Sequence, residues 1–213
     1  MKAIAINGSP RKGWNTDLIL QSALKGAVDA GAEVEMIHLY DLNYTGCKSC
    51  FACKLKDAEP CKCFLKDDLS PVLDKILAAD VVLFGTPIYF GEITSQMHAL
   101  IERLSFILMT YDDYSKKLFH GKVNCGCFYT MNVWQEGFEK MYAERMKQSF
   151  RVLDKLNGAR EEYACCDTYQ FSDYSRYQSA SFNEEHKRQM RENQFPKDLE
   201  AAYQIGQKLC KNE

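Results

Sequence analysis

The sequence predicts an α/β fold, in which a five-stranded parallel sheet is covered by helices on both faces. Two observations support this prediction. Apolar strand-like segments alternate along the 213 residues with segments whose apolar residues recur every three or four positions. One strand-like segment, residues 81–84, is apolar at every position, as expected of a central strand buried on both faces. No internal repeat or low-complexity linker interrupts the pattern, so we expect one domain over residues 1–213.

Each expected strand is followed by a helix. The strands are expected at 3–6, 33–39, 81–85, 122–130 and 160–168, and the helices at 17–30, from 70, at 94–108, 137–157 and 196–210. Gly31 suits the position just after a helix, Thr94 suits an N-cap, and Ser70 followed by Pro71 suits another helix start. Residues 40–66 are expected to form a polar loop that carries cysteines, and the last helix forms a C-terminal extension.

Composition excludes several classes of function. The net charge of -2 gives no basic surface for nucleic acid or anionic membranes. The N-terminus enters a strand at once, and no apolar run approaches the length of a membrane span. We therefore expect a cytoplasmic chain with no nucleic-acid or membrane partner. In that setting ten cysteines do not indicate a disulfide framework.

The first strand–loop–helix unit, residues 4–16, reads I-A-I-N-G-S-P-R-K-G-W-N-T and predicts a phosphate cradle. Backbone N–H groups and the positive end of a helix dipole converge on such a loop. It lacks both G-x-G-x-x-G and the G-K-[ST] ending of a P-loop, which favours a terminal phosphate monoester, as on FMN. The alternative is an ordinary turn with Asn15 as N-cap. The candidate phosphate ligands are Ser9, Arg11, Lys12, Asn15 and Thr16.

Parallel α/β sheets bind ligands outside the carboxyl ends of their strands. This rule brings together three loops of the chain, which span residues 9–16, 86–92 and 130–137. We expect the ligand site at this edge of the sheet.

With these loops identified, the chain resembles the flavodoxin-like NAD(P)H-dependent FMN reductases, and within them the branch of iron–sulfur flavoproteins. The motifs that carry the resemblance are I-N-G-S-P-R-K-G-W-N-T at 6–16, G-C-K-S-C-F-A-C at 46–53, C-F-L-K-D-D-L at 63–69 and T-P-I-Y-F-G at 86–91. The resemblance covers the first half of the chain, and beyond Thr110 only the order of elements matches. It implies a flavodoxin-like doubly wound sheet with strand order 2-1-3-4-5 in a three-layer α/β/α arrangement.

The resemblance also implies roles for the three loops. The first holds the FMN phosphate. The second lies along the isoalloxazine, although its aromatic residues could instead pack in the core. The third lines the flavin, but it is bulkier than the glycine-containing loops of many relatives, which would leave less space for a nicotinamide. The flavin candidates in the last two loops are Pro87, Ile88, Tyr89, Phe90, Gly91, Thr130, Met131 and Asn132.

The cysteine-bearing loop contains C-x2-C-x2-C at Cys47, Cys50 and Cys53. Three thiolates at this spacing can bind three corners of a [4Fe–4S] cluster, and a fourth cysteine completes it. Cys61 fits the looser spacing of iron–sulfur flavoproteins, whereas Cys63, the alternative fourth ligand, better fits the position before the F-x-K-D-D stretch. A zinc site, a redox-active thiol pair and unliganded thiols remain open. The other cysteines, which we expect to be buried and unreactive, are Cys125, Cys127, Cys165, Cys166 and Cys210.

The expected function is that of an FMN-dependent oxidoreductase. It would pass reducing equivalents from NAD(P)H or a reduced protein to a quinone, a flavin or another small acceptor. One alternative is an iron–sulfur flavoprotein that carries electrons between ferredoxin-like partners, and another is a non-enzymatic FMN- or zinc-binding interaction protein. Relatives complete their flavin site with a neighbouring subunit, which implies a homodimer or homotetramer. The aromatic segment 169–182 could cover the flavin, form a subunit interface or simply pack on the surface.

Overall fold

The computed structural model describes residues 1–211 and contains a five-stranded parallel sheet with strand order β2-β1-β3-β4-β5, as predicted. The strands are β1 (Lys2–Asn7), β2 (Glu33–His38), β3 (Val81–Pro87), β4 (Val123–Thr130) and β5 (Asn157–Cys165). The helices are α1 (Asn15–Asp29), α2 (Leu69–Ala78), α3 (Ser95–Ile107), α4 (Gln135–Met141), α5 (Ala143–Ser149), α6 (Glu184–Asn193) and α7 (Phe195–Cys210). In this part of the chain, none of the helices combines the length and the apolar character needed to cross a bilayer.

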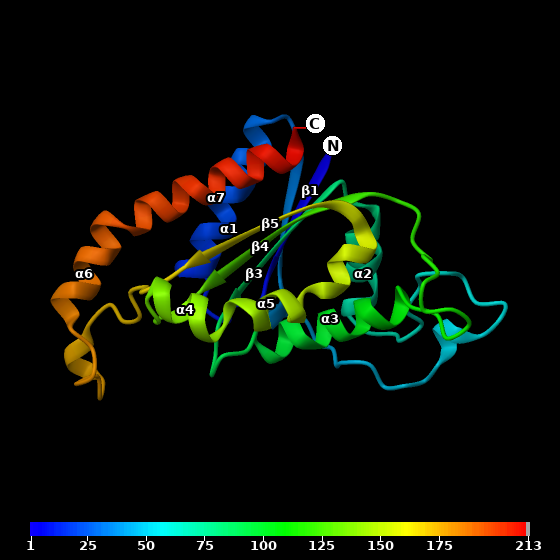
Figure 1. The fold of residues 1–213 in the computed structure, drawn as a ribbon, viewed down its shortest axis with the longest axis horizontal. Helices are drawn as coiled ribbons and strands as arrows, with labels where there is room; N and C mark the ends of the chain where they lie inside the picture. The colour runs from blue at the N-terminus through cyan, green and yellow to red at the C-terminus, as the bar shows by residue number, and fades with distance from the viewer. Residues whose placement is uncertain (212–213) are drawn as a thin grey trace.

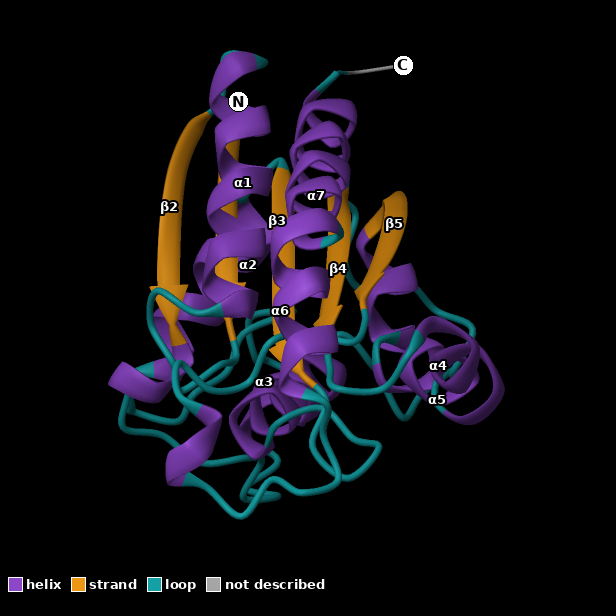
Figure 2. Cartoon of the chain, turned by 90° about the vertical axis from the view of Figure 1, so that its left-hand side faces the viewer, coloured by secondary structure: helices purple, strands orange, loops and turns teal. Residues whose placement is uncertain are grey.

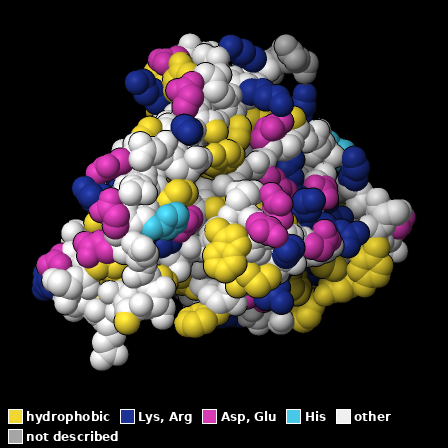
Figure 3. All heavy atoms as spheres, turned by 60° about the vertical axis from the view of Figure 1, so that its left-hand side comes forward, with side chains coloured by type: hydrophobic (Ala, Val, Ile, Leu, Met, Phe, Trp, Pro, Cys, Tyr) yellow, Lys and Arg dark blue, Asp and Glu magenta, His cyan; other side chains and the backbone are white. Residues whose placement is uncertain are grey.

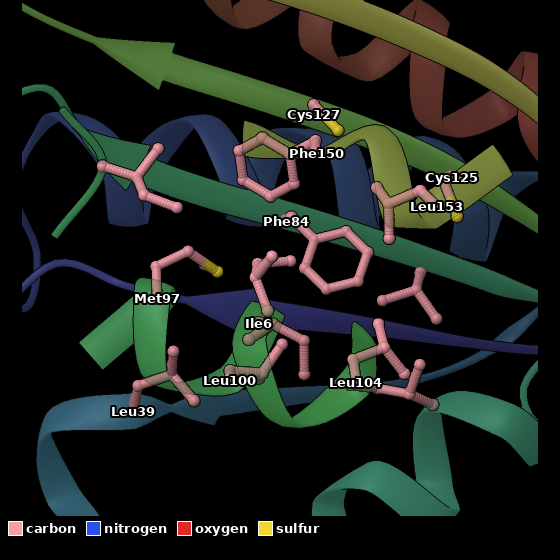
Figure 4. Packing of buried hydrophobic residues seen from close by; sticks show 14 of the residues in the cluster. Ile6, Leu39, Phe84, Met97, Leu100, Leu104, Cys125, Cys127, Phe150 and Leu153 are labelled. Carbon is pink, nitrogen blue, oxygen red and sulfur yellow. The ribbon is translucent and has the colours of Figure 1, made fainter. Parts of the chain in front are cut away.

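Helices cover both faces of the sheet (Figure 1). Alternate residues of each central strand face opposite layers, so that Ile4 and Ile6 of β1 pack toward α2 and α3, whereas Ala3 and Ala5 face α1 and α7. Figure 4 shows Phe84 of β3 beside Phe150, whose ring centroid is 5.9 Å away, in the layer that includes α3. Both faces of β1 and β3 are buried, which explains the continuous apolar run at residues 81–84.

Helices α1 and α7 cross at very close range. A Cβ on Gly26 would lie 2.0 Å from the carbonyl oxygen of Tyr203, and a Cβ on Gly206 would lie 1.9 Å from that of Ala23. Only glycine permits the two backbones to approach so closely. This crossing fixes α1, whose N-terminus carries the first of the three loops.

Several expected boundaries are wrong. Residues 137–157 are not one helix, because the chain breaks near Tyr142 and again near Phe150, giving α4, α5 and a 3-10 segment at Arg151–Leu156. Helix α6 was not predicted. Ser70 is not the N-cap of α2, because the helix begins at Leu69, after Asp68 as N-cap. The Thr94 cap and the Gly31 position are confirmed.

The carboxyl ends of the strands point to one end of the molecule, where the long loops gather (Figure 2). The three candidate flavin loops and the cysteine-bearing loop all leave the sheet or its neighbouring helices at this end. The cysteine-bearing loop then runs along α3 to the C-terminal end of that helix and to the residues that precede β4, so its cysteines lie away from the flavin loops, toward the amino ends of the strands (Figure 1).

Candidate functional site

The loop after β1 forms a buried polar cradle at the N-terminus of α1. Ser9, Asn15 and Thr16 are all buried, with 5%, 7% and 3% of their surface exposed. The Ser9 N–H donates to Asn7 Oδ1 at 2.8 Å, and the Ser9 hydroxyl accepts from the Arg11 N–H at 3.1 Å. Asp17 stabilises the turn by accepting from Asn7 Nδ2 and from the Gly13 N–H. The alternative that Asn15 is the N-cap is wrong, since Trp14 occupies that position.

Segment 169–171 lies across this cradle. Asn15 Nδ2 donates to the Tyr169 carbonyl at 2.8 Å, and Arg11 Nη1 donates to the Gln170 carbonyl at 2.8 Å. The Arg11 guanidinium also lies 4.2 Å from the centre of the Trp14 ring. Arg11 retains further N–H donors, because a guanidinium has five. Part of the aromatic segment 169–182 therefore does lie over the predicted phosphate loop.

Lys12 does not point into the cradle. Its ammonium pairs with the Asp41 carboxylate on the surface, and both side chains are more than half exposed. Of the five predicted phosphate ligands, the structure brings together Ser9, Arg11, Asn15 and Thr16.

The loop after β3 turns sharply outward. Phe90 and Gly91 both have positive φ, 53° and 81°, and Tyr89 pairs with Glu92 across the turn. Tyr89 is 43% exposed and Phe90 is fully exposed, so the alternative that they pack in the core is wrong. Figure 3 shows that large apolar side chains are exposed in several places on the lower half of the surface in that view. Such a loop offers a flat ligand an aromatic edge and an accessible backbone.

Two hydroxyl contacts join the three loops. Thr16 Oγ1 lies 2.7 Å from Thr130 Oγ1, which connects the first loop to the end of β4. Thr94 Oγ1, just after the second loop, donates to the Gly8 carbonyl at 2.8 Å. The Ile88 N–H donates to the Thr130 carbonyl at 2.9 Å. The loops therefore form one connected rim.

The loop after β4 is held by residues that the sequence did not single out. Met131 is buried, and its carbonyl accepts from the Thr168 N–H and hydroxyl. The ammonium of the buried Lys187 donates to the Asn132 carbonyl and pairs with Asp167. Burial acts to raise the pKa of Asp167, but hydrogen bonds from Lys187 and His186 outweigh it and hold that pKa below its usual value. Helix α6 is thereby attached to the third loop.

The cysteine-bearing loop lies along α3. The Tyr44 hydroxyl donates to the Gln96 carbonyl near the start of the helix, and the Lys54 ammonium donates to the Phe106 and Met109 carbonyls at its end. A Cβ on Gly46 would lie 2.4 Å from a carboxylate oxygen of Glu102, so the loop and the helix are in close contact. The loop has no strand, and Ser49, Phe51 and Cys61 have positive φ.

Four of its five cysteines line one pocket beside α3, together with Phe51, Phe64, Phe106 and Arg103; these cysteines are Cys47, Cys50, Cys53 and Cys63. Cys61 lies instead in a neighbouring groove with Phe119 and His120. Burial raises the pKa of Cys53, Lys54 opposes the rise, and the thiols of the other three pocket cysteines add to it. Over residues 1–211, no three His, Cys, Asp or Glu side chains stand close enough to hold a single metal ion.

Four of the remaining five cysteines are buried, as expected, and the fifth, Cys166, is not. Cys125 and Cys127 face the same layer and are buried, and burial raises the pKa of Cys125 to about 12. Cys165 is buried in the opposite layer, where its thiol donates to Asp198 Oδ2 at 3.1 Å. Cys210 is buried, and Cys166 is only half-buried.

The residues present fit both predicted groups. The cradle combines buried hydroxyl and amide side chains with the first N–H groups of α1, which have no partner within the helix. The buried Trp14 Nε1 and Asn132 Oδ1, at the first and third loops, also have no hydrogen-bond partner. The cysteine pocket offers four soft thiol ligands, and a [4Fe–4S] cluster binds each to a different iron, so its ligands stand further apart than those of one ion.

Comparison with known proteins identifies the family of the chain. The sequence model of the family described as NADPH-dependent FMN reductase matches residues 1–139. Iron–sulfur flavoproteins from Methanocaldococcus jannaschii and Archaeoglobus fulgidus are 39% and 43% identical to the chain over 103 residues. Each match covers 48% of this chain and 51% or 48% of the relative, so the chain spans about half the length of these curated relatives.

Solved structures show the same fold. An NAD(P)H:quinone oxidoreductase from Methanothermobacter marburgensis superposes with a TM-score of 0.70 at 13% identity, over 100% of this chain and 98% of that one. An archaeal flavodoxin superposes with a TM-score of 0.51 at 12% identity, over 99% and 96%. At such low identity these structures establish the flavodoxin-like fold alone.

Proposed function

The chain belongs to the NADPH-dependent FMN reductase family, and on that basis we propose that it binds FMN and passes reducing equivalents from NAD(P)H or a reduced protein to a small acceptor. A quinone, a free flavin or a nitro compound would suit as acceptor. The observation that carries the proposal is the connected rim of three loops at the carboxyl ends of β1, β3 and β4. Ligands of doubly wound sheets bind at this position.

The first loop, the second loop and segment 169–171 have separate tasks in this proposal. Ser9, Asn15 and the first turn of α1 bind the terminal phosphate, and Arg11 adds a positive charge beside it. The loop at residues 87–91 orients the ring. Segment 169–171 excludes water from the phosphate side. When bound, FMN itself supplies the hydride and electron chemistry.

Titration with FMN tests the binding site. We expect stoichiometric quenching of flavin fluorescence, and Asn15→Ala should weaken FMN affinity by about 10- to 100-fold, since a hydrogen bond to a charged group contributes about 1.5–3 kcal/mol. Riboflavin, which lacks the phosphate, is the control and should bind wild type and variant equally. If Asn15→Ala weakened the binding of FMN and of riboflavin equally, the phosphate would have to bind elsewhere.

Anaerobic reduction tests the donor. We expect NADH or NADPH to bleach the flavin absorption of the FMN-loaded protein. If neither does so while a reduced ferredoxin does, the chain is an electron carrier and not an NAD(P)H reductase.

A second candidate function is favoured by the four thiols of one pocket, namely an iron–sulfur flavoprotein that moves electrons between a [4Fe–4S] cluster and FMN. Helix α3 connects the two sites, because its N-cap Thr94 contacts the flavin loop and Arg103 lines the pocket. Nine residues of helix correspond to roughly 14 Å. A ferredoxin-like partner would exchange electrons with this cluster. Absorption of anaerobically purified protein, with and without bleaching by dithionite, tests for the cluster.

Assembly into a homodimer or homotetramer is also part of the proposal. It is supported by the exposed aromatic side chains beside the flavin rim, among them Phe90 and Trp134, which a second copy of the chain could cover. Light scattering on the FMN-loaded protein would measure the mass.

A further inference from the structure

Arg103 of α3 is a charged side chain in the interior. Its side chain is only 1% exposed, although arginine is almost never fully buried unless it is paired. Moving a guanidinium out of water is costly and must be offset by anions and hydrogen-bond acceptors. The hydrogen-bond partners of Arg103 therefore indicate which kind of ligand the surrounding pocket binds.

Those partners lie at both ends of the cysteine-bearing loop. Nη1 donates to Asp67 Oδ2 at 2.5 Å and points to the Thr45 carbonyl at 3.4 Å, and Nη2 donates to Cys63 Sγ at 3.0 Å and to Ser70 Oγ at 2.7 Å. Nε is buried without a hydrogen-bond partner. Asp67 supplies one negative charge, and one N–H direction of the guanidinium is still unused.

We propose that Arg103 is the positioning residue of the thiolate site, that it selects Cys63 as the fourth ligand beside Cys47, Cys50 and Cys53, and that its charge offsets the charge of the bound thiolates. This inference rests on the second candidate function. It favours Cys63 over Cys61, which the spacing of relatives would select.

Geometry separates the two candidates for the fourth ligand. Cys63 lies in the pocket with its sulfur held by the guanidinium, whereas Cys61 lies in the neighbouring groove, with a backbone φ of 58°. Bringing Cys61 into the pocket would require rearrangement of the adjoining backbone and would leave a buried cation beside an unliganded thiol. Cys63 needs no such change.

The same contact gives Arg103 an electronic effect. Hydrogen bonds to cluster sulfurs and nearby positive charge stabilise the reduced, more negative state and so raise the reduction potential. The Ser49 N–H, which donates to Cys47 Sγ at 3.4 Å, is a second such donor. Removal of the Arg103 charge should therefore lower the potential of any cluster that still forms.

The test is anaerobic reconstitution of FMN-loaded protein with ferrous iron and sulfide. Wild type and Cys61→Ser should bind about four irons per chain, the content of one [4Fe–4S] cluster, and Cys63→Ser should lose most of it. Arg103→Gln should either lose iron or hold a cluster of more negative potential, as measured by redox titration followed by electron paramagnetic resonance. Arg103→Lys, which keeps the charge, should have an iron content and a reduction potential between those of wild type and Arg103→Gln. Bound flavin in each sample reports that the protein is folded.

Two results would overturn the inference while leaving the cluster in place: loss of iron in Cys61→Ser but not in Cys63→Ser, or wild-type iron and potential in Arg103→Gln. Wild-type protein that takes up no iron would overturn both the cluster and the role of Arg103. Flavin binding in the same samples would still report separately on the proposed FMN site.

Discussion

The flavin rim lies at the N-terminal end of α3, the pocket of the cysteine-bearing loop lies near the C-terminal end of that helix, and the two sites are built in opposite ways. Every part of the rim begins within a few residues of a strand end, and its hydroxyl and amide side chains Asn15, Thr16 and Thr130 are buried, with Thr16 and Thr130 in contact. The cysteine-bearing loop has no strand and contacts α3 through a few side chains, chiefly Tyr44, Lys54 and Arg103. The comparison shows that the first site is preformed by the sheet. The second site depends on one buried cation, Arg103, and, as we propose, on its ligand.

The largest effect should follow from disturbing the support of the rim. Gly206→Ala places a methyl group 1.9 Å from the Ala23 carbonyl, so α7 must move away from α1. Overpacking of this kind costs about 1–3 kcal/mol and occasionally more. We expect a lower urea midpoint and weaker FMN binding, because α1 carries the phosphate cradle.

The matched control is Gln204→Ala on the exposed side of α7, which should change little. Iron uptake by the cysteine pocket, on the opposite face of the sheet, should stay at the wild-type level in the folded fraction of Gly206→Ala. Loss of both sites together would show that they are not independent.

A smaller effect should follow from Gly91→Ala in the ring-binding loop. Alanine at a φ of 81° is strained by about 1–2 kcal/mol, and its Cβ would lie 2.9 Å from the Tyr142 ring. We expect affinity for FMN and for riboflavin to fall together by roughly tenfold. An effect on FMN alone would instead assign this loop to the phosphate, against the division of roles proposed above.

The cysteine-bearing loop should respond to acid. Burial acts to raise the pKa of Asp67, but the hydrogen bond and charge of Arg103, with the N–H groups of Ser70 and Leu69, hold it below its usual value. A depressed folded-state pKa contributes stability above the unfolded-state value of about 4, and this stability is lost as pH falls through the folded-state pKa.

Amide hydrogen exchange across residues 44–67 measures this loss. Between pH 7 and 5 protection of the loop should not change on account of Asp67, and below about pH 4 it should fall. In Asp67→Asn the loop should be less protected at neutral pH, and the acid-dependent part of the change should be absent. An unchanged acid response in Asp67→Asn would assign that response to another group.

The sequence predicted the sheet and the flavin rim because both depend on local signals. Apolar strands ending in Asn7, Pro87 and Thr130 are visible along the chain, and the switch-point rule brings their loops together. The broken helix at 137–157 was missed because periodicity continues across Tyr142, where the ring packs against Gly91 in another part of the chain. A contact between distant residues leaves no trace in local spacing.

Two omissions differ in kind. Helix α6 has almost no apolar stripe, since it is held by Lys187 and Arg191, which contact the third and first loops. Its Asn183 N-cap and the acidic residues that follow could have revealed it. Arg103 carried no such signal, because an arginine next to the apolar stripe of a helix normally reaches solvent. Only the folded structure shows that both ends of the cysteine-bearing loop meet there.

The smallest effect should come from Lys12, which the sequence grouped with the phosphate ligands. Its ammonium pairs with Asp41 in solvent, and exposed pairs contribute about 0–1 kcal/mol, so Lys12→Met should change FMN affinity by less than about threefold. Its neighbour Arg11 contacts the Gln170 carbonyl at the cradle, and Arg11→Ala should weaken FMN binding by roughly tenfold or more.

Isothermal titration calorimetry with FMN at one salt concentration measures the affinity of both variants, and so gives the ratio of their losses. If Lys12→Met lost as much FMN affinity as Arg11→Ala, Lys12 would have to break its pair with Asp41 and contact the phosphate when FMN binds. The phosphate cradle would then take its final arrangement only when its ligand binds, as we propose for the cysteine-bearing loop. The flavin rim would no longer be a preformed site, and the difference between the two sites would disappear.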